Sequence, residues 1–165
     1  MDPAGLDQLA AEDREERQGA LARWQAAGSG AVAALVAGLE HPHWRVRAAA
    51  AGLLDHVADE RCAEPLTRAL RDPVAAVRRN AVHAIGCQRC KPAPLALDTV
   101  AELIDRAIRD PSIRVRRAAA HQLGCQRPDG RAAEALRGIL AGSRDAKLLG
   151  IARWALGVQE RAPLG

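Results

Sequence analysis

The sequence contains no phenylalanine and no tyrosine, and it has only three tryptophans. The hydrophobic core must therefore be built mainly from Ala, Leu, Val and Ile. Ala-rich helix faces let neighbouring helices approach closely, which suits a regular stack of helices. The lack of aromatic side chains also argues against sequence-specific binding of single-stranded RNA, because such binding stacks bases on aromatic platforms.

The chain also lacks long apolar segments and a basic N-terminal segment. No run of 18 apolar residues is present, so neither a membrane span nor a membrane partner is expected. Acidic residues at Asp2, Asp7, Glu12 and Asp13 argue against a secretory signal. The expected location is therefore the cytoplasm, where the four cysteines would be thiols or metal ligands rather than disulfides.

The charge is unevenly distributed along the chain. Residues 1–18 hold six acidic and two basic residues, whereas residues 19–165 hold 22 basic and 14 acidic residues. A basic body with an acidic leader indicates either an anionic partner or a leader that folds back onto the body. The simpler interpretation, an ordinary charged surface on a soluble protein, stays open at this point.

An internal repeat is the strongest pattern in the sequence. One segment begins with Asp-Pro, continues through Val-Arg-Arg or a close variant, and ends at Gly-Cys-Gln-Arg; it occurs twice with an offset of 38 residues. The two full copies run over residues 72–89 and 110–127, and weaker copies lie at residues 41–47 and 144–157. A period of this length indicates one supersecondary unit that stacks on itself to form a solenoid.

The repeat divides the chain into pairs of helices. No segment alternates between apolar and polar residues at period two, so no sheet is expected. Asp72 and Asp110 are predicted to cap the second helices, with the following prolines at the first helical position. Gly86, Gly124 and Gly157 are predicted to close these helices in the left-handed conformation. The expected helices are a leader at 4–26, first helices at 31–39, 62–71, 98–109 and 131–141, and second helices at 44–57, 74–87, 112–125 and 146–158.

These helices predict an all-α, right-handed solenoid of about four helix pairs. The expected organisation is an acidic leader or cap at residues 1–28, a repeat domain at residues 29–159, and a tail at residues 160–165. The loop at residues 90–97 contains two prolines and lengthens the second interval between repeats. Insertions in solenoids gather on one face, which is often the binding face.

The repeat resembles HEAT repeats, especially the short kind found in phycobilisome lyases. The matching residues are 59–66, then Asp-Pro at 72–73 and 110–111, and Val-Arg at 77–78 and 115–116. The resemblance implies that Asp72, Arg78, Asp110 and Arg116 form a structural ladder between repeats. The outer copies depart from this pattern, with His41 in place of Asp and Leu149 in place of Arg, as suits terminal repeats.

A stripe of polar side chains recurs on the second helices. Arg79, His83 and Cys87 are four residues apart, and Arg117, His121 and Cys125 repeat that spacing, so each triplet lies along one helix face. In HEAT-like stacks the second helices line the concave surface. We therefore interpret the stripe as a binding face for an anionic or helical segment of another protein. The predicted contact residues are Arg79, His83, Arg117, His121 and Trp154.

The same residues allow a second interpretation, a zinc site. Cys87, Cys90, His121 and Cys125 would supply three thiolates and an imidazole, which suit tetrahedral zinc, and His83 or His56 could replace His121. The alternative is that the cysteines are small apolar residues at helix ends and the histidines are solvated. Zinc is the one cofactor that these residues suggest.

Two further functions remain as alternatives. The side chains of Arg45, Arg79, Arg114, Arg117, Lys147 and Arg153 could contact the phosphates of a nucleic acid. Bilin-lyase activity is implied only by the resemblance, since some relatives of this repeat type have it. Two identical His–Cys pairs without an orienting acid indicate repeat duplication rather than an active site, so an enzyme is not expected. The sequence thus favours a protein-binding scaffold.

Overall fold

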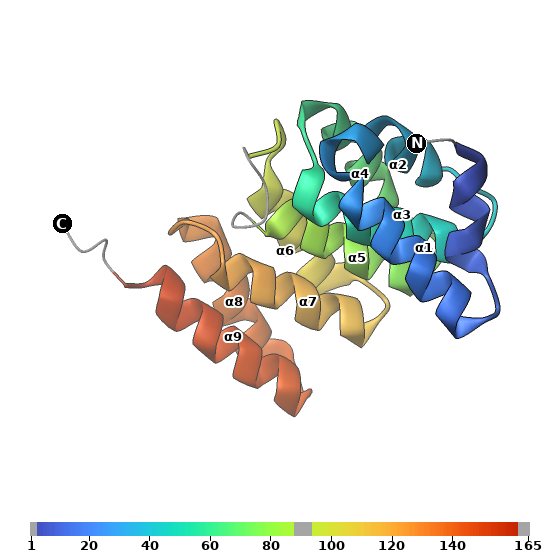
Figure 1. Ribbon diagram of the computed structural model, residues 1–165. Coiled ribbons are helices and arrows are strands. Elements are labelled where there is room, and N and C mark those ends of the chain that lie inside the picture. The colour runs from blue at the N-terminus through green and yellow to red at the C-terminus, as the bar shows by residue number, and fades with distance from the viewer. Residues whose placement is uncertain (1–2, 88–93, 162–165) are drawn as a thin grey trace.

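The computed structural model describes residues 3–87 and 94–161. Within these residues the secondary-structure elements are helices joined by loops, and there are no strands. In Figure 1 the helices stack in pairs along one direction, so the predicted all-α solenoid is confirmed. The helices are η1 (Pro3–Ala10), α1 (Arg14–Ala26), η2 (Gly28–Ala31), α2 (Val32–Gly38), α3 (Trp44–Val57), η3 (Glu60–Cys62), α4 (Ala63–Ala69), α5 (Ala75–Gly86), α6 (Thr99–Arg109), α7 (Ile113–Gly124), α8 (Gly130–Gly142) and α9 (Ala146–Gln159). None of these helices is both long and apolar enough to cross a membrane.

The second helices α3, α5, α7 and α9 form one layer, in which each packs against the next. The first helices α2, α4, α6 and α8 pack on their own second helices and form the other layer. Val46, Val77, Val115 and Leu148 occupy equivalent positions in the four second helices and are almost completely buried. Small aliphatic side chains therefore fill the core, as the lack of Phe and Tyr predicts.

The leader is not the single helix expected at residues 4–26. A 3-10 segment, η1, is followed by a break at residues 11–13 and then by α1. The break arises because the Asp13 carboxylate accepts a hydrogen bond from the N–H of Glu16 at 2.8 Å and so begins a new helix. Leu6, Leu9 and Trp24 are buried in the same hydrophobic core as the repeats.

The leader thus folds onto the body, but its acidic cluster does not hold it there. Glu12, Asp13, Glu15 and Glu16 are exposed, and in the part of the chain that the structure describes they form no ion pair with the body. Asp7 lies 3.1 Å from His41. The indole N–H of Trp24 donates to the carbonyl of Gly5, which fixes η1 on α1.

The turn before each central second helix differs from the prediction. The N-caps are Val74 and Ser112, not the aspartates. Asp72 and Asp110 lie two residues earlier, and their carboxylates accept from the N–H groups of Val74 and Ser112 at 2.7 and 2.8 Å. The Asp-Pro pair therefore forms a turn in front of the helix, because a short acidic side chain can bond the backbone two residues on.

The predicted left-handed closure at Gly86, Gly124 and Gly157 is wrong. Among the described residues only Gly28 has a positive φ, of 54°. Gly86 and Gly124 are the last residues of α5 and α7, and at both positions the next repeat approaches too closely for a side chain. A Cβ atom at Gly86 would lie 2.7 Å from the Cβ of Gln122. Gly157 lies inside α9, with open space beside it.

Candidate functional site

Acidic residues are unevenly distributed between the two layers of the solenoid, whereas basic residues occur in both. The second helices contain one acidic residue, Asp55, which is 2% exposed. Their basic residues number nine: Arg45, Arg47, Arg78, Arg79, Arg114, Arg116, Arg117, Lys147 and Arg153. Four acids lie on first helices, at Glu64, Glu102, Asp105 and Glu134, and other acids of the repeats lie in loops, among them Asp72, Asp110 and Asp145. We call the exposed face of α3, α5, α7 and α9 the second-helix surface.

Three of the nine basic side chains link successive repeats. Arg47 binds Asp72 at 2.6 Å, and Arg78 binds Asp110 through two parallel hydrogen bonds of 2.7 and 2.9 Å. Arg78 also donates to the carbonyl of Asp72 at 2.8 Å. Burial raises the pKa of Asp110. The hydrogen bonds from Arg78 and from the Ser112 N–H lower it by more than burial raises it, so the net shift of the pKa is downward.

The last link differs from the predicted ladder. Arg116 keeps the local contact, donating to the carbonyl of Asp110 at 2.7 Å, but Asp145 binds Arg117 instead, at 2.6 Å. The cause lies in the sequence. Asp145 is two residues closer to Leu148 than Asp72 is to Val77 or Asp110 is to Val115. It caps α9 directly by accepting from the Leu148 N–H at 2.7 Å. Arg117, predicted to contact a partner, is thus engaged between repeats.

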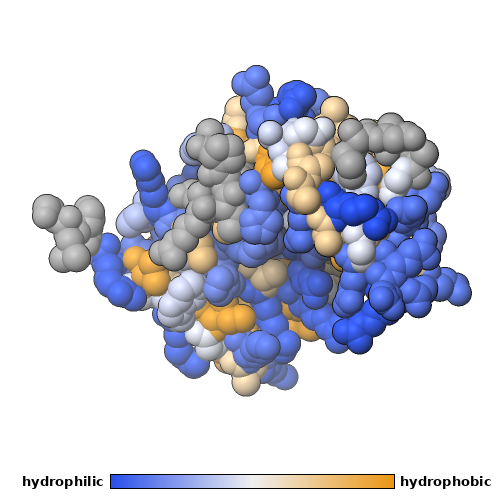
Figure 2. All heavy atoms as spheres, in the orientation of Figure 1, coloured by the Kyte–Doolittle hydropathy of each residue, from blue (hydrophilic) through white to orange (hydrophobic). Residues whose placement is uncertain are grey.

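Six cations of the second helices have no carboxylate partner in the described ranges. They are Arg45, Arg79, Arg114, Arg116, Lys147 and Arg153. The guanidinium of Arg45 lies over the ring of Trp44, 5.6 Å from its centre, and Trp44 is 41% exposed. Arg79 is exposed on α5, as predicted for a contact residue. The face of the molecule seen in Figure 2 is largely hydrophilic, and hydrophobic side chains form small separate groups on it.

A groove lies on this surface where the leader meets the first repeat. Its volume is about 410 Å³. Leu21 of α1 and Leu53 of α3 supply apolar walls, and the charged side chains of Arg17 and Arg45 lie among the lining residues. Arg17 donates to the carbonyl of Ala11 and so keeps its net positive charge within the groove.

An exposed aromatic stack marks the other end of the surface. The ring of His121 lies on the indole of Trp154, with centroids 4.9 Å apart and planes inclined by 17°. Trp154 is 44% exposed, although its ring edge also covers Gly124. The Cys125 sulfur lies 3.9 Å from Nδ1 of His121. The structure therefore brings together two of the predicted contact residues.

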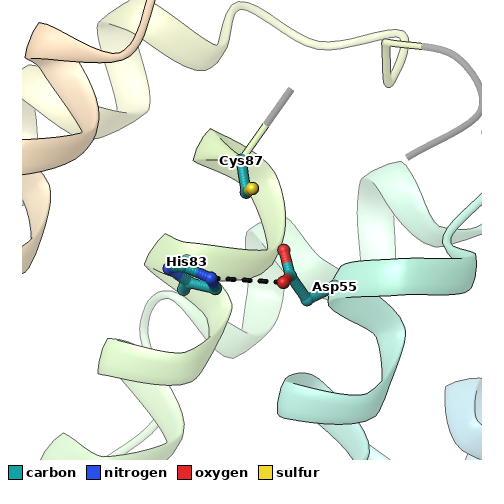
Figure 3. A group of neighbouring side chains, drawn as sticks. All are labelled: Asp55, His83 and Cys87. Atoms are coloured by element: carbon teal, nitrogen blue, oxygen red, sulfur yellow. Dashed lines mark ion pairs between the residues drawn. The ribbon is translucent and has the colours of Figure 1, made fainter. Parts of the chain in front are cut away.

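His83 lies in a different environment, although it occupies the same position of the repeat. Its Nε2 is 3.2 Å from Oδ2 of Asp55, and its Nδ1 is 2.9 Å from the side-chain amide nitrogen of Gln122. Cys87 follows as the C-cap residue of α5, and one ligand atom each from Asp55, His83 and Cys87 lies within 4.8 Å of the others (Figure 3). The cluster joins α3 to α5.

This cluster departs from the predicted metal set. In the described part of the chain, Cys87 lies with Asp55 and His83, while His121 and Cys125 contact each other. Cys90 lies outside the described residues. Sequence analysis missed Asp55, although a signal was present: the alignment of the repeats places it where Gly86, Gly124 and Gly157 stand in the other copies.

Comparison with known families agrees with this architecture. The model for HEAT repeats matches residues 4–86, 32–105 and 64–157. The chain belongs to the HEAT-repeat family. The match begins within the leader, which also shares the core of the repeats. No curated protein matches this chain.

Solved structures show the same fold at low sequence identity. A chain from the complex of CpcE and CpcF of phycocyanin lyase from Nostoc sp. PCC7120 has a TM-score of 0.77 and 19% identity, over 93% of this chain and 96% of that one. A designed armadillo repeat protein in complex with the peptide (KR)4 has a TM-score of 0.60 and 19% identity, over 94% and 80% of the two chains. An engineered protein has a TM-score of 0.61 and 19% identity, over 96% and 80%.

The HEAT-repeat architecture separates structural positions from variable ones. The valine and arginine positions that build the core and the ladder repeat with little change. The exposed position that holds His83 and His121 holds Gly52 in the first repeat and Trp154 in the last. In a repeat protein the shared positions serve stacking, so function is expected at exposed positions that differ between repeats.

Proposed function

We propose that this HEAT-repeat protein is a scaffold that holds an acidic segment of another protein along the second-helix surface. Solenoids of this kind are typical protein-interaction scaffolds. The observation that carries the proposal is the excess of positive charge on four adjacent helices: of their nine basic side chains, six have no carboxylate partner in the described ranges, and their one acid is buried. Such a surface attracts anionic segments and repels basic ones.

The apolar features of the surface favour a protein segment over a bare polyanion. The groove between α1 and α3 can take an aliphatic side chain between Leu21 and Leu53 while Arg45 meets a carboxylate. The stack of His121 on Trp154 offers an aromatic anchor at the far end. Interfaces concentrate binding energy in such aromatic and arginine side chains. A designed armadillo repeat protein of similar fold holds the basic peptide (KR)4, whereas the positive charge of the second-helix surface favours Glu and Asp.

A catalytic role receives little support from the cluster at His83. Asp55 supplies the orienting acid that the sequence did not reveal. However, Asp55 contacts Nε2 and Gln122 contacts Nδ1, so both ring nitrogens are engaged and neither is left to accept a proton from Cys87. A cysteine nucleophile needs its base on a ring nitrogen that the acid does not use. The proposal therefore treats the protein as a non-enzymatic scaffold.

The proposal is tested with the full chain and a fluorescent peptide of alternating Glu and Leu residues. Fluorescence anisotropy is expected to show binding that weakens as salt rises, and no binding of the matching Lys and Leu peptide. Reversal of two unpaired cations, Arg79→Glu with Arg114→Glu, is expected to weaken binding at least about 10-fold, which corresponds to about 1.4 kcal/mol.

The matched control reverses two exposed cations in loops outside the second helices, Arg127→Glu with Arg144→Glu, and should leave the affinity unchanged. Equal affinity for the acidic and basic peptides would contradict the proposal. A DNA oligonucleotide that binds more tightly than the acidic peptide, with a steep dependence on salt, would instead support the nucleic-acid alternative.

A further inference from the structure

We propose that Asp55, His83 and Cys87 form a zinc-type metal site that joins the first repeat to the second. A carboxylate, an imidazole and a thiolate converge there from α3 and α5 (Figure 3). Zinc takes ligands of all three kinds, usually four in tetrahedral array, and a site with three protein ligands keeps one position open. The structure thus assigns a metal-binding role to residues other than the Cys-rich set that the sequence suggests.

The spacing of the ligand atoms fits one ion. Two oxygen or nitrogen ligands at about 2.0–2.1 Å from a tetrahedral zinc lie about 3.3 Å apart. Nε2 of His83 and Oδ2 of Asp55 are 3.2 Å apart, so an ion can bind both with little movement. The Cys87 sulfur lies within the same 4.8 Å group. Cys87 is the C-cap residue of α5, and its backbone N–H donates to the carbonyl of His83 at 2.9 Å, which holds the two residues near each other.

The third repeat orients the imidazole. A metal-bound Nε2 must be unprotonated, which places the remaining ring proton on Nδ1 and requires an acceptor there. The side-chain nitrogen Nε2 of Gln122 lies 2.9 Å from Nδ1 of His83. A half-turn of the Gln122 amide group places its oxygen Oε1 there instead, as the acceptor. Oε1 has no hydrogen-bond partner in the part of the chain that the structure describes, so the rotation costs Oε1 no existing bond. Coordination also releases the thiol proton of Cys87 to solvent.

The repeat provides a natural comparison within the molecule. His121 and Cys125 reproduce the spacing of His83 and Cys87, but Gly86 stands where Asp55 would be, so that pair lacks its carboxylate. Trp154 covers His121 instead. The complete ligand set occurs at the junction of α3 and α5, and the exposure of His83 leaves the open coordination position facing solvent. A bound ion would fasten the first two repeats together.

The test uses the full chain, stripped with a chelator and titrated with Zn²⁺ or Co²⁺ alone. One ion per chain is expected, with a thiolate-to-Co²⁺ charge-transfer band and a rise in the thermal midpoint. Cys87→Ser should abolish the band. Asp55→Asn and His83→Gln should weaken Zn²⁺ binding at least about 10-fold, the loss that even an outer partner of a metal site produces.

The duplicated pair supplies the matched controls. Cys125→Ser and His121→Gln should leave the stoichiometry, the band and the affinity unchanged. Circular dichroism in the presence of chelator shows whether each variant is folded. If Asp55→Asn does not fold, His83→Gln tests the site instead, because His83 is exposed. A band that survives Cys87→Ser, a band lost with Cys125→Ser, or the absence of binding at one ion per chain would each overturn the proposal. All readouts are independent of any protein partner.

Discussion

Arg78→Ala is expected to destabilise the protein by about 3–5 kcal/mol, because it leaves a buried carboxylate without its partner. The Arg78 side chain is 8% exposed and that of Asp110 is fully buried. Arg106 lies 3.6 Å from Asp110 and retains a weaker attraction, so the lower end of this range is expected. Guanidinium titrations followed by circular dichroism measure the loss as a shift of the unfolding midpoint.

Arg117→Ala is the matched control, because it removes the same side chain from the equivalent contact at the next junction. The Arg117 and Asp145 side chains are 28% and 27% exposed, so water compensates for much of the lost interaction. The expected cost is therefore well below that of Arg78→Ala. Equal losses for the two variants would mean that burial of the ion pair does not determine its contribution.

The pH dependence gives a second test of the same pair. The pKa of Asp110 in the folded protein lies below its ordinary value of 3.8. The pair therefore contributes its full stability above the unfolded value, and the contribution is lost as the pH falls through the folded pKa. The gap in stability between the wild type and Asp110→Asn should narrow below about pH 4, since asparagine does not titrate. A gap that stays constant through this range would show that the charge of Asp110 is not its source.

Repetition made the architecture predictable from the sequence. The offset between the Asp-Pro segments places the second helices within one or two residues of their observed bounds, because each copy repeats the same cap, core and ladder positions. The prediction failed where a copy departs from its neighbours. Asp145 is displaced by two residues relative to Asp110, and this small shift moves the inter-repeat contact from Arg116 to Arg117.

The site was less predictable because its contacts cross between repeats. His83 and His121 occupy the same position of the repeat, with Arg four residues before and Cys four residues after, yet one meets Asp55 and the other meets Trp154. Asp55 comes from the preceding repeat, at the position that is glycine in the other copies, whereas Trp154 comes from the following repeat, at the position of the histidines themselves. Periodicity identifies the helix face that carries the stripe, but the partner of each side chain depends on packing between neighbouring helices.

The second large prediction concerns Gly124, which occupies the repeat position that Asp55 holds in the first repeat. Gly124→Ala is expected to cost about 3 kcal/mol, at the upper end of the usual range for overpacking a core. The added Cβ would lie 2.6 Å from the Trp154 ring, 2.8 Å from the Cβ of Ala155 and 2.9 Å from its Cα. The last of these contacts is with backbone, so α9 must move away from α7.

Gly138→Ala provides the opposite expectation in the same part of the protein. Gly138 lies in the middle of α8 with open space around it, so alanine gains helix propensity without a clash. A stabilisation of about 0.5–1 kcal/mol is expected in the same denaturant titrations. If both variants were stabilised, the close approach of α9 to Gly124 would be contradicted.

Gly124→Ala also connects the packing of the repeats to the proposed binding surface. The ring that it displaces is the one on which His121 stacks. We therefore expect a change in the fluorescence of Trp154, measured beside the emission of the buried Trp24 in a background where Trp44 is replaced by Phe, and weaker binding of the acidic peptide. Gly138→Ala should change neither. If Gly124→Ala lost stability without a change in Trp154 fluorescence, α7 and α9 would have separated without altering the environment of the Trp154 ring. The close packing at Gly124 would then stabilise the fold without contributing to the binding surface.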